Sequence, residues 1–421
     1  MRAKPRRLSP RWLGAAALLL AAAAHAAPPE PVITHFAQPG LTAKELGVIV
    51  NDADPDSVAI ATYYLEKRGI PSANLIHVRF RPGRSTLSRE EFVDLKRRVD
   101  RATPGHVEAY ALAWARPFRV DCMSITSAFA FGFDPAYCAS GCRPTRRSPY
   151  FDSDAARPFA AYRMRPAMSL AAASVTAAKR LIDRGAASDG SNPAGTAYLV
   201  STSDRARNVR AAEYPALRAQ MQRIFPTEIV EADALEDRSD VMFYFTGLAN
   251  VAALDRNRFL PGAIADHLTS AGGDLFGGPQ MSSLAWLQAG ATGSYGAVVE
   301  PCNFPAKFPD PGIIMAHYLQ GETLIEAYWK SVQMPGQGLF IGEPLARPFA
   351  GISQHTGDGG TTVSARLLAP GLYDLQAAPS LAGPYRSVGR LPVGRGTREI
   401  RLGKVPPAYY RFERTADPAP R

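Results

Sequence analysis

Short apolar runs and stretches with helical periodicity alternate along much of the chain. The apolar runs that predict strands cover residues 46–50, 75–80, 107–115, 197–201, 228–231 and 241–245. The amphipathic stretches that predict helices cover residues 58–68, 89–101, 169–184 and 214–224. Such alternation predicts an α/β fold with a mostly parallel sheet and helices on both faces.

Two segments depart from this alternation. Residues 121–162 are rich in Pro, Ser, Arg and aromatic residues and hold three of the four cysteines, which predicts a long surface loop braced by disulfides. After Phe349, short alternating runs follow the glycine-rich residues 357–360 and predict a small antiparallel β module. We therefore expect an α/β domain at 46–350, a linker at 351–360, the β module at 361–414 and a tail at 415–421.

The first residues predict an export signal. Five basic residues precede an apolar run from Trp12 to Ala24, and small residues around Ala24-His25-Ala26 suit a signal peptidase. The run spans 13 residues, whereas a membrane-spanning helix needs about 20. We therefore expect residues 1–26 to be removed, residues 27–45 to form an N-terminal extension, and the mature protein to be periplasmic or secreted without a transmembrane anchor.

Net charge and composition limit the classes of partner that we expect for this protein. Removing residues 1–26 leaves 43 basic against 38 acidic residues, a net charge of +5. That mildly basic balance does not indicate a nucleic-acid-binding surface. The sequence predicts no cofactor, and it leaves the partner unknown, with a protein or a component of the cell envelope as the candidates.

Four cysteines, Cys122, Cys138, Cys142 and Cys302, allow three pairings. An even count in an exported protein favours disulfides. The short turn between Cys138 and Cys142 suggests a local disulfide, which would pair Cys122 with Cys302. A zinc site is the alternative, but no histidine lies near any of the four in sequence, so no metal is expected.

A carboxylate cluster follows the first predicted strand. Asp52, Asp54 and Asp56 lie where this strand hands over to a helix, a position at which open α/β sheets bind ligands. The same residues also make a good helix start, with Asp54 as the N-cap, Pro55 at the first helical position and Asp56 in the first turn. Both interpretations remain open at this stage, and the helix start is favoured.

The densest polar segment contains Asp266, His267, Thr269 and Ser270, followed by two glycines. On an extended strand, Asp266 and His267 point to opposite faces and cannot both enter one site. His267 and Thr269 can share a face, but a catalytic triad also needs an orienting acid from elsewhere. A structural histidine is therefore favoured over a catalytic one.

Several motifs resemble an uncharacterised family of secreted bacterial proteins over residues 46–349. They are Val48-Ile49-Val50-Asn51, Tyr63-Tyr64, the "RGIP" turn Arg68-Gly69-Ile70-Pro71 with Lys67 before it, Asn74, the run 290–305, and the segments Gly321-Glu322-Thr323-Leu324-Ile325-Glu326-Ala327-Tyr328-Trp329 and Gly342-Glu343-Pro344-Leu345-Ala346-Arg347-Pro348. More distantly, the order of elements is similar to that of gingipain- and caspase-type cysteine peptidases.

In that peptidase fold, a His-Gly pair ends one strand and the nucleophilic Cys ends the next. The matching positions in this chain are Thr246-Gly247 and Ser270. Neither required residue is present, so the resemblance implies the architecture without the peptidase chemistry.

Two classes of function follow. One is a non-catalytic binding or scaffold protein on a degenerate peptidase-like fold. The other is a hydrolase or peptidase that uses a displaced site around His267, Ser270 or Cys302. The missing histidine and cysteine favour the first class, and a disulfide is the more economical role for Cys302 because no histidine is close to it in sequence.

Overall fold

The computed structural model describes residues 32–35, 40–139, 142–222, 224–350, 354–357, 360–364, 371–380, 383–394, 399–403 and 409–415. The predicted signal at 1–26 lies outside the described residues, as do most of the predicted tail and parts of the predicted linker.

The first half of the α/β body comprises the elements η1 (Ala43–Glu45), β2 (Leu46–Asn51), α1 (Pro55–Arg68), η2 (Ser72–Asn74), β3 (Leu75–Val78), β4 (Thr86–Leu87), α2 (Arg89–Ala102), β5 (Ala109–Leu112), β6 (Arg119–Val120), β7 (Met123–Ser124), α3 (Ile125–Phe131), η3 (Pro135–Tyr137), α4 (Pro158–Tyr162), β8 (Ala167–Ser169) and α5 (Val175–Ser188).

The second half comprises β9 (Thr196–Ser201), η4 (Asn208–Glu213), α6 (Tyr214–Met221), β10 (Thr227–Glu231), β11 (Val241–Thr246), η5 (Leu254–Arg256), β12 (Phe259–His267), α7 (Leu284–Ala289), β13 (Gly293–Ala297), η6 (Pro305–Lys307), α8 (Pro311–Leu319), α9 (Leu324–Ser331), η7 (Pro335–Gln337) and β14 (Gly338–Gly342).

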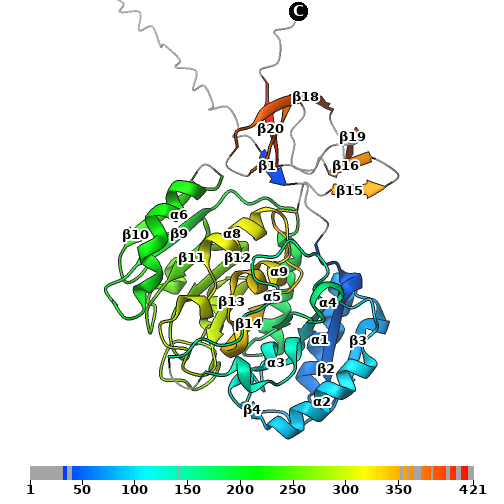
Figure 1. The fold of residues 1–421 in the computed structure, drawn as a ribbon, viewed down its shortest axis with the longest axis vertical. Coiled ribbons are helices and arrows are strands. Elements are labelled where there is room, and N and C mark those ends of the chain that lie inside the picture. Colours follow the sequence, from blue (N-terminus) through cyan, green and yellow to red (C-terminus); the bar gives the residue numbers. More distant parts are fainter. Residues whose placement is uncertain are drawn as a thin grey trace, which may run out of the picture.

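Ten strands form one sheet in the order β10-β9-β11-β12-β13-β14-β8-β5-β2-β3 (Figure 1). Each half repeats the same arrangement, with its second strand outermost and its first, third and fourth strands following inward. The strands β13 and β14 join the halves and pair antiparallel, whereas the other neighbouring strands of the sheet pair parallel. The two halves therefore present the carboxyl ends of their parallel strands at opposite edges of the sheet.

Helices cover both faces, as the alternating pattern predicts. On β2, Val48 and Val50 belong to the same buried cluster as residues of α1, α8 and α9, while Ile49 between them belongs to a second cluster that includes residues of α2 and α3. Successive strand residues point to opposite faces, so an all-buried strand such as β2 requires an apolar layer on each side.

Local signals explain where the predicted helices begin. Asp54 caps α1 by accepting a hydrogen bond from the Asp56 backbone, and Pro55 occupies the first position of that helix. Gly69 ends α1 with φ of 61°, a left-handed conformation that suits glycine. Ser88 and Glu91 form a capping box at the start of α2.

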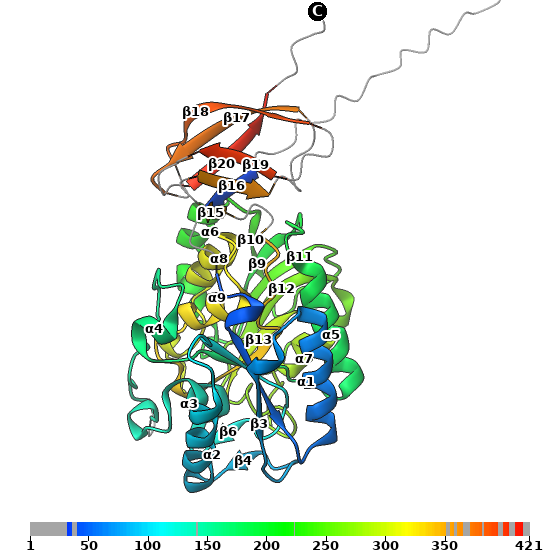
Figure 2. The same cartoon turned by 90° about the vertical axis from the view of Figure 1, so that its right-hand side faces the viewer.

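The C-terminal strands form two small antiparallel sheets. Their strands are β15 (Gln354–Gly357), β16 (Gly360–Ser364), β17 (Gly371–Ala378), β18 (Arg386–Val393), β19 (Glu399–Gly403) and β20 (Tyr409–Arg414), joined by the N-terminal strand β1 (Val32–His35). The orders are β1-β20-β17-β18 and β15-β16-β19. Figures 1 and 2 show these strands gathered at one end of the molecule, beyond the ten-stranded sheet.

The structure departs from the predicted boundaries in four places. The helix predicted at 169–184 begins six residues later, because β8 occupies the start of that range and Ser174 caps α5. The segment 121–162 is not all surface loop, since α3 within it is buried. The predicted linker contains β15, and the predicted N-terminal extension contains β1, which completes the β module. No helix in the described ranges is long and apolar enough to span a membrane.

Candidate functional site

The carboxyl ends of β11 and β12 lie side by side, with Thr246 paired to His267. This is the edge at which the peptidase resemblance places its histidine and its nucleophile. Thr246 is fully buried, and its carbonyl accepts hydrogen bonds from the Leu268 backbone and from Arg210. A Cβ on Gly247 would lie 2.0 Å from the carbonyl oxygen of Arg207, so the loop after β9 packs directly on this strand end.

A buried ion pair lies at the carboxyl ends of β11 and β12, on one face of the sheet. Arg210 on η4 donates to the Asp266 carboxylate at 2.7 Å, and the two side chains are 5% and 1% exposed. The same guanidinium donates to the carbonyls of Thr246 and Pro309. Burial acts to lower the pKa of Arg210, but the charge and hydrogen bond of Asp266, together with the charges of Tyr214 and Asp310, outweigh burial, and the net pKa is raised. Burial raises the pKa of Asp266. Both side chains are enclosed by the protein, so the pair is a structural contact between η4 and β12.

His267 points to the opposite face and has no free nitrogen. Its Nδ1 accepts a hydrogen bond from Trp286 Nε1 at 2.9 Å, so Nε2 carries the proton and donates to the Met281 carbonyl at 3.0 Å. Burial lowers the pKa of His267 to about 4. The imidazole is therefore neutral and held at both nitrogens, which leaves it no lone pair with which to act as a general base.

The residues after His267 pack closely against neighbouring segments. Thr269 Oγ1 donates to Gln280 Oε1 and accepts from Arg207 Nε. A Cβ on Gly296 of β13 would lie 2.3 Å from the carbonyl carbon of Gly272, and one on Gly273 would lie 2.5 Å from the carbonyl oxygen of Gly296, so the two backbones approach too closely for a side chain at Gly273 or Gly296. Ser270 is partly exposed in this turn, and with both His267 nitrogens taken, it has no imidazole to activate it.

All four cysteines form disulfides, which confirms the disulfides predicted from their even number. The predicted pairing is wrong, because Cys122 pairs with Cys138 and Cys142 pairs with Cys302. Cys138 and Cys142 are therefore not bonded to each other. The Cys142–Cys302 disulfide ties the segment after α3 to the segment after β13. Cys302 therefore has no thiol to offer as a nucleophile.

The aspartates after β2 serve the helix start. Asp54 caps α1, and Asp52 accepts from the exposed His77 at 2.8 Å. Among the residues that the structure describes, no group of three or more His, Cys, Asp or Glu side chains is placed to hold a metal ion. The ligand site predicted at Asp52, Asp54 and Asp56 remains a prediction.

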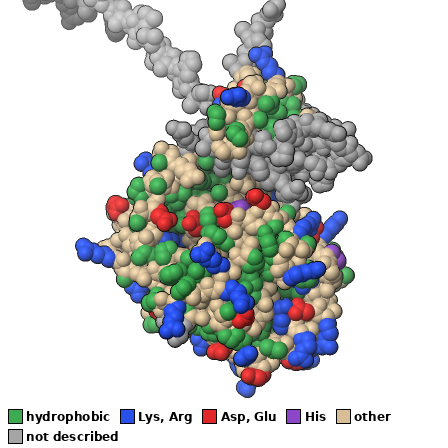
Figure 3. All heavy atoms as spheres, viewed as in Figure 1, with side chains coloured by type: hydrophobic (Ala, Val, Ile, Leu, Met, Phe, Trp, Pro, Cys, Tyr) green, Lys and Arg blue, Asp and Glu red, His purple; other side chains and the backbone are tan. Residues whose placement is uncertain are grey.

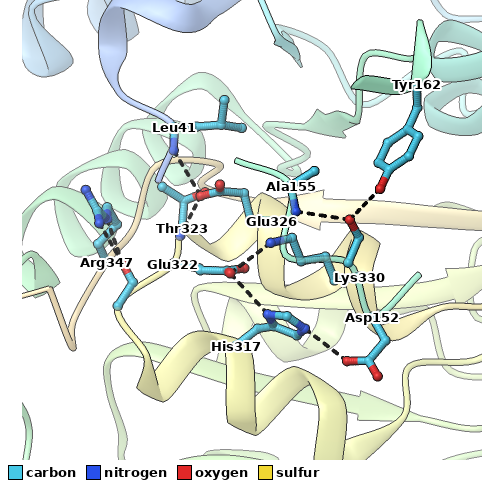
Figure 4. Close-up of polar contacts among 12 residues, drawn as sticks. Leu41, Asp152, Ala155, Tyr162, His317, Glu322, Thr323, Glu326, Lys330 and Arg347 are labelled. Carbon is cyan, nitrogen blue, oxygen red and sulfur yellow. Dashed lines mark hydrogen bonds and ion pairs between the residues drawn. The ribbon is translucent and has the colours of Figure 1, made fainter. Parts of the chain in front are cut away.

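A buried charged cluster between α8 and α9 was not singled out by the sequence (Figure 4). His317 faces Glu322 Oε1 at 3.1 Å and Asp152 Oδ1 at 3.2 Å, and Lys330 donates to the same Glu322 oxygen at 2.8 Å. Burial acts to raise the pKa of Glu322, but the His317 hydrogen bond and the Lys330 charge outweigh it, and the net pKa is lowered. Glu322 is thus an ionised carboxylate compensated by neighbouring donors.

The same cluster fastens the N-terminal segment to the body. Glu326 Oε2 accepts from the backbone of Leu41 at 3.1 Å and from both the backbone and hydroxyl of Thr323 (Figure 4). Burial raises the pKa of Glu326, and the Glu322 charge adds to this effect. The Thr-x-x-Glu spacing of a capping box was the sequence signal that could have located Glu326. The cluster holds three segments together through these hydrogen bonds and ion pairs.

A groove of about 690 Å³ runs between α6 and α8, near the Arg210 side of the candidate edge. Its walls are largely apolar, and Leu217, Met221 and Ile313 are among the residues that line them. The volume lies within the roughly 300–1,000 Å³ typical of ligand sites. The molecule is therefore an α/β protein whose candidate catalytic edge is closed by internal contacts and borders an open apolar groove.

Comparisons with known proteins add little to this description. No family model matches the chain, and no curated protein matches its sequence. Among solved structures, one described as "Structure of Protease" aligns over 89% of this chain and 92% of its own, with a TM-score of 0.42 and 7% sequence identity.

Proposed function

We propose that this chain is an exported, non-catalytic binding or scaffold protein built on a degenerate peptidase-like fold. It would act in the periplasm or outside the cell, with a protein or a component of the cell envelope as its partner. The observation that carries the proposal is His267, the histidine nearest the matching strand ends, which is buried, neutral and bonded at both nitrogens.

Two further observations support a binding role over a displaced hydrolase site. The Cys302 sulfur is bonded to Cys142, so its nucleophilic thiol is absent under oxidising conditions. Both nitrogens of His267, the base predicted for Ser270, are already hydrogen-bonded, and a serine hydroxyl without a base is a weak nucleophile. By contrast, Arg210 joins Asp266 to the carbonyls of Thr246 and Pro309, a set of internal contacts that suits a structural role.

The test uses the mature protein with a mixed peptide library, with and without reductant. We expect no cleavage from the parent or from His267→Gln. A Cys302→Ala variant tests whether any cleavage depends on the Cys302 thiol. A Cys122→Ser/Cys138→Ser variant is its control, because it removes the other disulfide and leaves Cys302 paired. Thiol-dependent cleavage that is lost only with Cys302 would contradict the proposal.

Export is tested separately. N-terminal sequencing of protein recovered outside the cytoplasm should begin at Ala27 or within a residue or two. Recovery of an intact Met1 in the membrane fraction would contradict the predicted cleavage while leaving the binding role untouched.

A further inference from the structure

Four arginines line a groove at the carboxyl end of β3. The groove lies between the segment after β3 and helix α2 and has a volume of about 510 Å³. The arginines are Arg79, Arg81, Arg84 and Arg98, and the remaining lining residues are Phe80, Leu87, Glu91, Asp94 and Leu95. Figure 3 shows Lys and Arg side chains gathered over the part of the surface where Figure 1 places α2. We call this feature the arginine groove.

A buried asparagine fixes the backbone that carries two of these arginines. Asn51, at the end of β2 and fully buried, accepts from the Phe80 backbone N–H and donates to the Phe80 carbonyl, each at 3.1 Å. The Phe80 ring also meets Trp114 edge to face at 5.2 Å. Arg79 and Arg81 flank Phe80 in sequence, so both extend from a backbone held in place without any ligand.

Both acidic side chains of the arginine groove already accept hydrogen bonds from other residues of the protein. Glu91 Oε1 accepts from Arg84 at 2.8 Å, while Glu91 Oε2 accepts from the Ser88 backbone in the capping box of α2. Asp94 accepts from Arg98. Four arginines against two acids leave two uncompensated positive charges, and among the described residues Arg79 and Arg81 are exposed without an ion pair or hydrogen bond to either side chain.

Arg84 adds an unused donor. Its Nη2 is fixed on Glu91, but its Nε is buried and has no hydrogen-bond partner among the described residues. The Arg84 side chain as a whole is 37% exposed, so a ligand in the groove can reach its guanidinium. A buried N–H without a partner is costly, and an acceptor that takes the Nε–H would remove that cost. Guanidinium groups match phosphate oxygens in a planar, two-pronged geometry, and two uncompensated charges suit a ligand with a charge of about −2 or more.

We propose that the arginine groove binds a diphosphate or phosphomonoester group, presented either by a free molecule or by a lipid headgroup. Arg79 and Arg81 hold the anion, and Arg84 donates from the inner wall. The groove lies at the carboxyl edge of the first half, whereas the closed edge of β11 and β12 belongs to the second half. The two proposals therefore stand on separate residues, and a failure of one leaves the other intact.

The experiment measures binding of pyrophosphate to the full mature chain by titration calorimetry at low and at physiological ionic strength. Arg79→Gln/Arg81→Gln removes the two uncompensated charges. Arg101→Gln/Arg205→Gln is the matched control, because it removes the same charge at exposed positions that do not line the groove. We expect saturable binding that weakens at least about tenfold in the first variant and by less than about twofold in the control.

A second arm separates the two sources of the anion. Flotation with phosphatidylcholine vesicles, with and without phosphatidic acid, tests the headgroup, and pyrophosphate tests the free ligand. Saturable binding to either probe that requires Arg79 and Arg81 supports the inference. No saturable binding to either probe, or an equal loss in both double variants, overturns it, since the latter would show only a general effect of net charge.

Discussion

Replacing His267 by glutamine should remove a specific part of the acid sensitivity of the protein. In the folded chain, Trp286 donates to one imidazole nitrogen and the other donates to the Met281 carbonyl. A glutamine side chain can take both roles, since it carries one acceptor and one donor group. The substitution thus preserves the hydrogen bonds while removing the titrating group.

The size of the effect follows from the pKa. Burial lowers the pKa of His267 from 6.5 to about 4, so the folded state favours the neutral imidazole. The stability from this preference is fully present above pH 6.5 and is lost as the pH falls toward 4. Going from pH 7 to pH 5, the protonation of His267 in the unfolded chain should cost the parent about 2 kcal/mol of unfolding free energy that the variant keeps.

Urea denaturation at several pH values between 4 and 8, followed by tryptophan fluorescence, measures this difference. Other groups contribute to both proteins, so the relevant quantity is the parent stability minus the variant stability at each pH. His77→Gln is the control, because the His77 side chain is 59% exposed. If the parent-minus-variant difference stays constant from pH 7 to pH 5, His267 is not the buried neutral group described here.

Two further predictions concern covalent and backbone constraints. Replacing Cys142–Cys302, which closes a separation of 160 residues, by serines should cost about 5 kcal/mol, whereas replacing Cys122–Cys138, with a separation of 16, should cost about 3 kcal/mol; equal losses in chemical denaturation would contradict this ordering. Gly296→Ala should cost about 1–3 kcal/mol because its Cβ would meet Gly272, whereas Gly105→Ala, with nothing within 4 Å, should leave the thermal midpoint almost unchanged; equal midpoints for the two variants would contradict the close approach.

Much of the fold could be predicted from periodicity because its elements are local. The predicted strand at 46–50 and helix at 89–101 match β2 and α2 closely, since apolar runs and capping residues lie within each segment. The strand β8 was missed because it spans only Ala167–Ser169 and merges in sequence with the helix that follows it. A three-residue strand carries too few positions to show a period.

The contacts of the candidate site were harder to predict, because they join residues far apart in sequence. Asp266 was noticed beside His267, but its partner Arg210 lies 56 positions earlier and carries no local signal. The cysteine pairing failed for the same reason, since proximity in sequence favoured Cys138 with Cys142, whereas the fold brings Cys142 to Cys302. The alternation of a strand did predict that Asp266 and His267 would face opposite sides.

The repeated topology places the two candidate sites of this protein at opposite ends of the strands. Both halves place loops at the carboxyl ends of parallel strands, where open α/β sheets bind ligands. In the second half, Arg210 forms a buried ion pair with Asp266 at this position. In the first half, Asn51 is hydrogen-bonded to the Phe80 backbone after β3, and Arg79 and Arg81 are exposed. Because β13 and β14 pair antiparallel, the carboxyl ends of the parallel strands point in opposite directions in the two halves. A ligand held by the arginines would therefore not touch the carboxyl ends of β11 and β12.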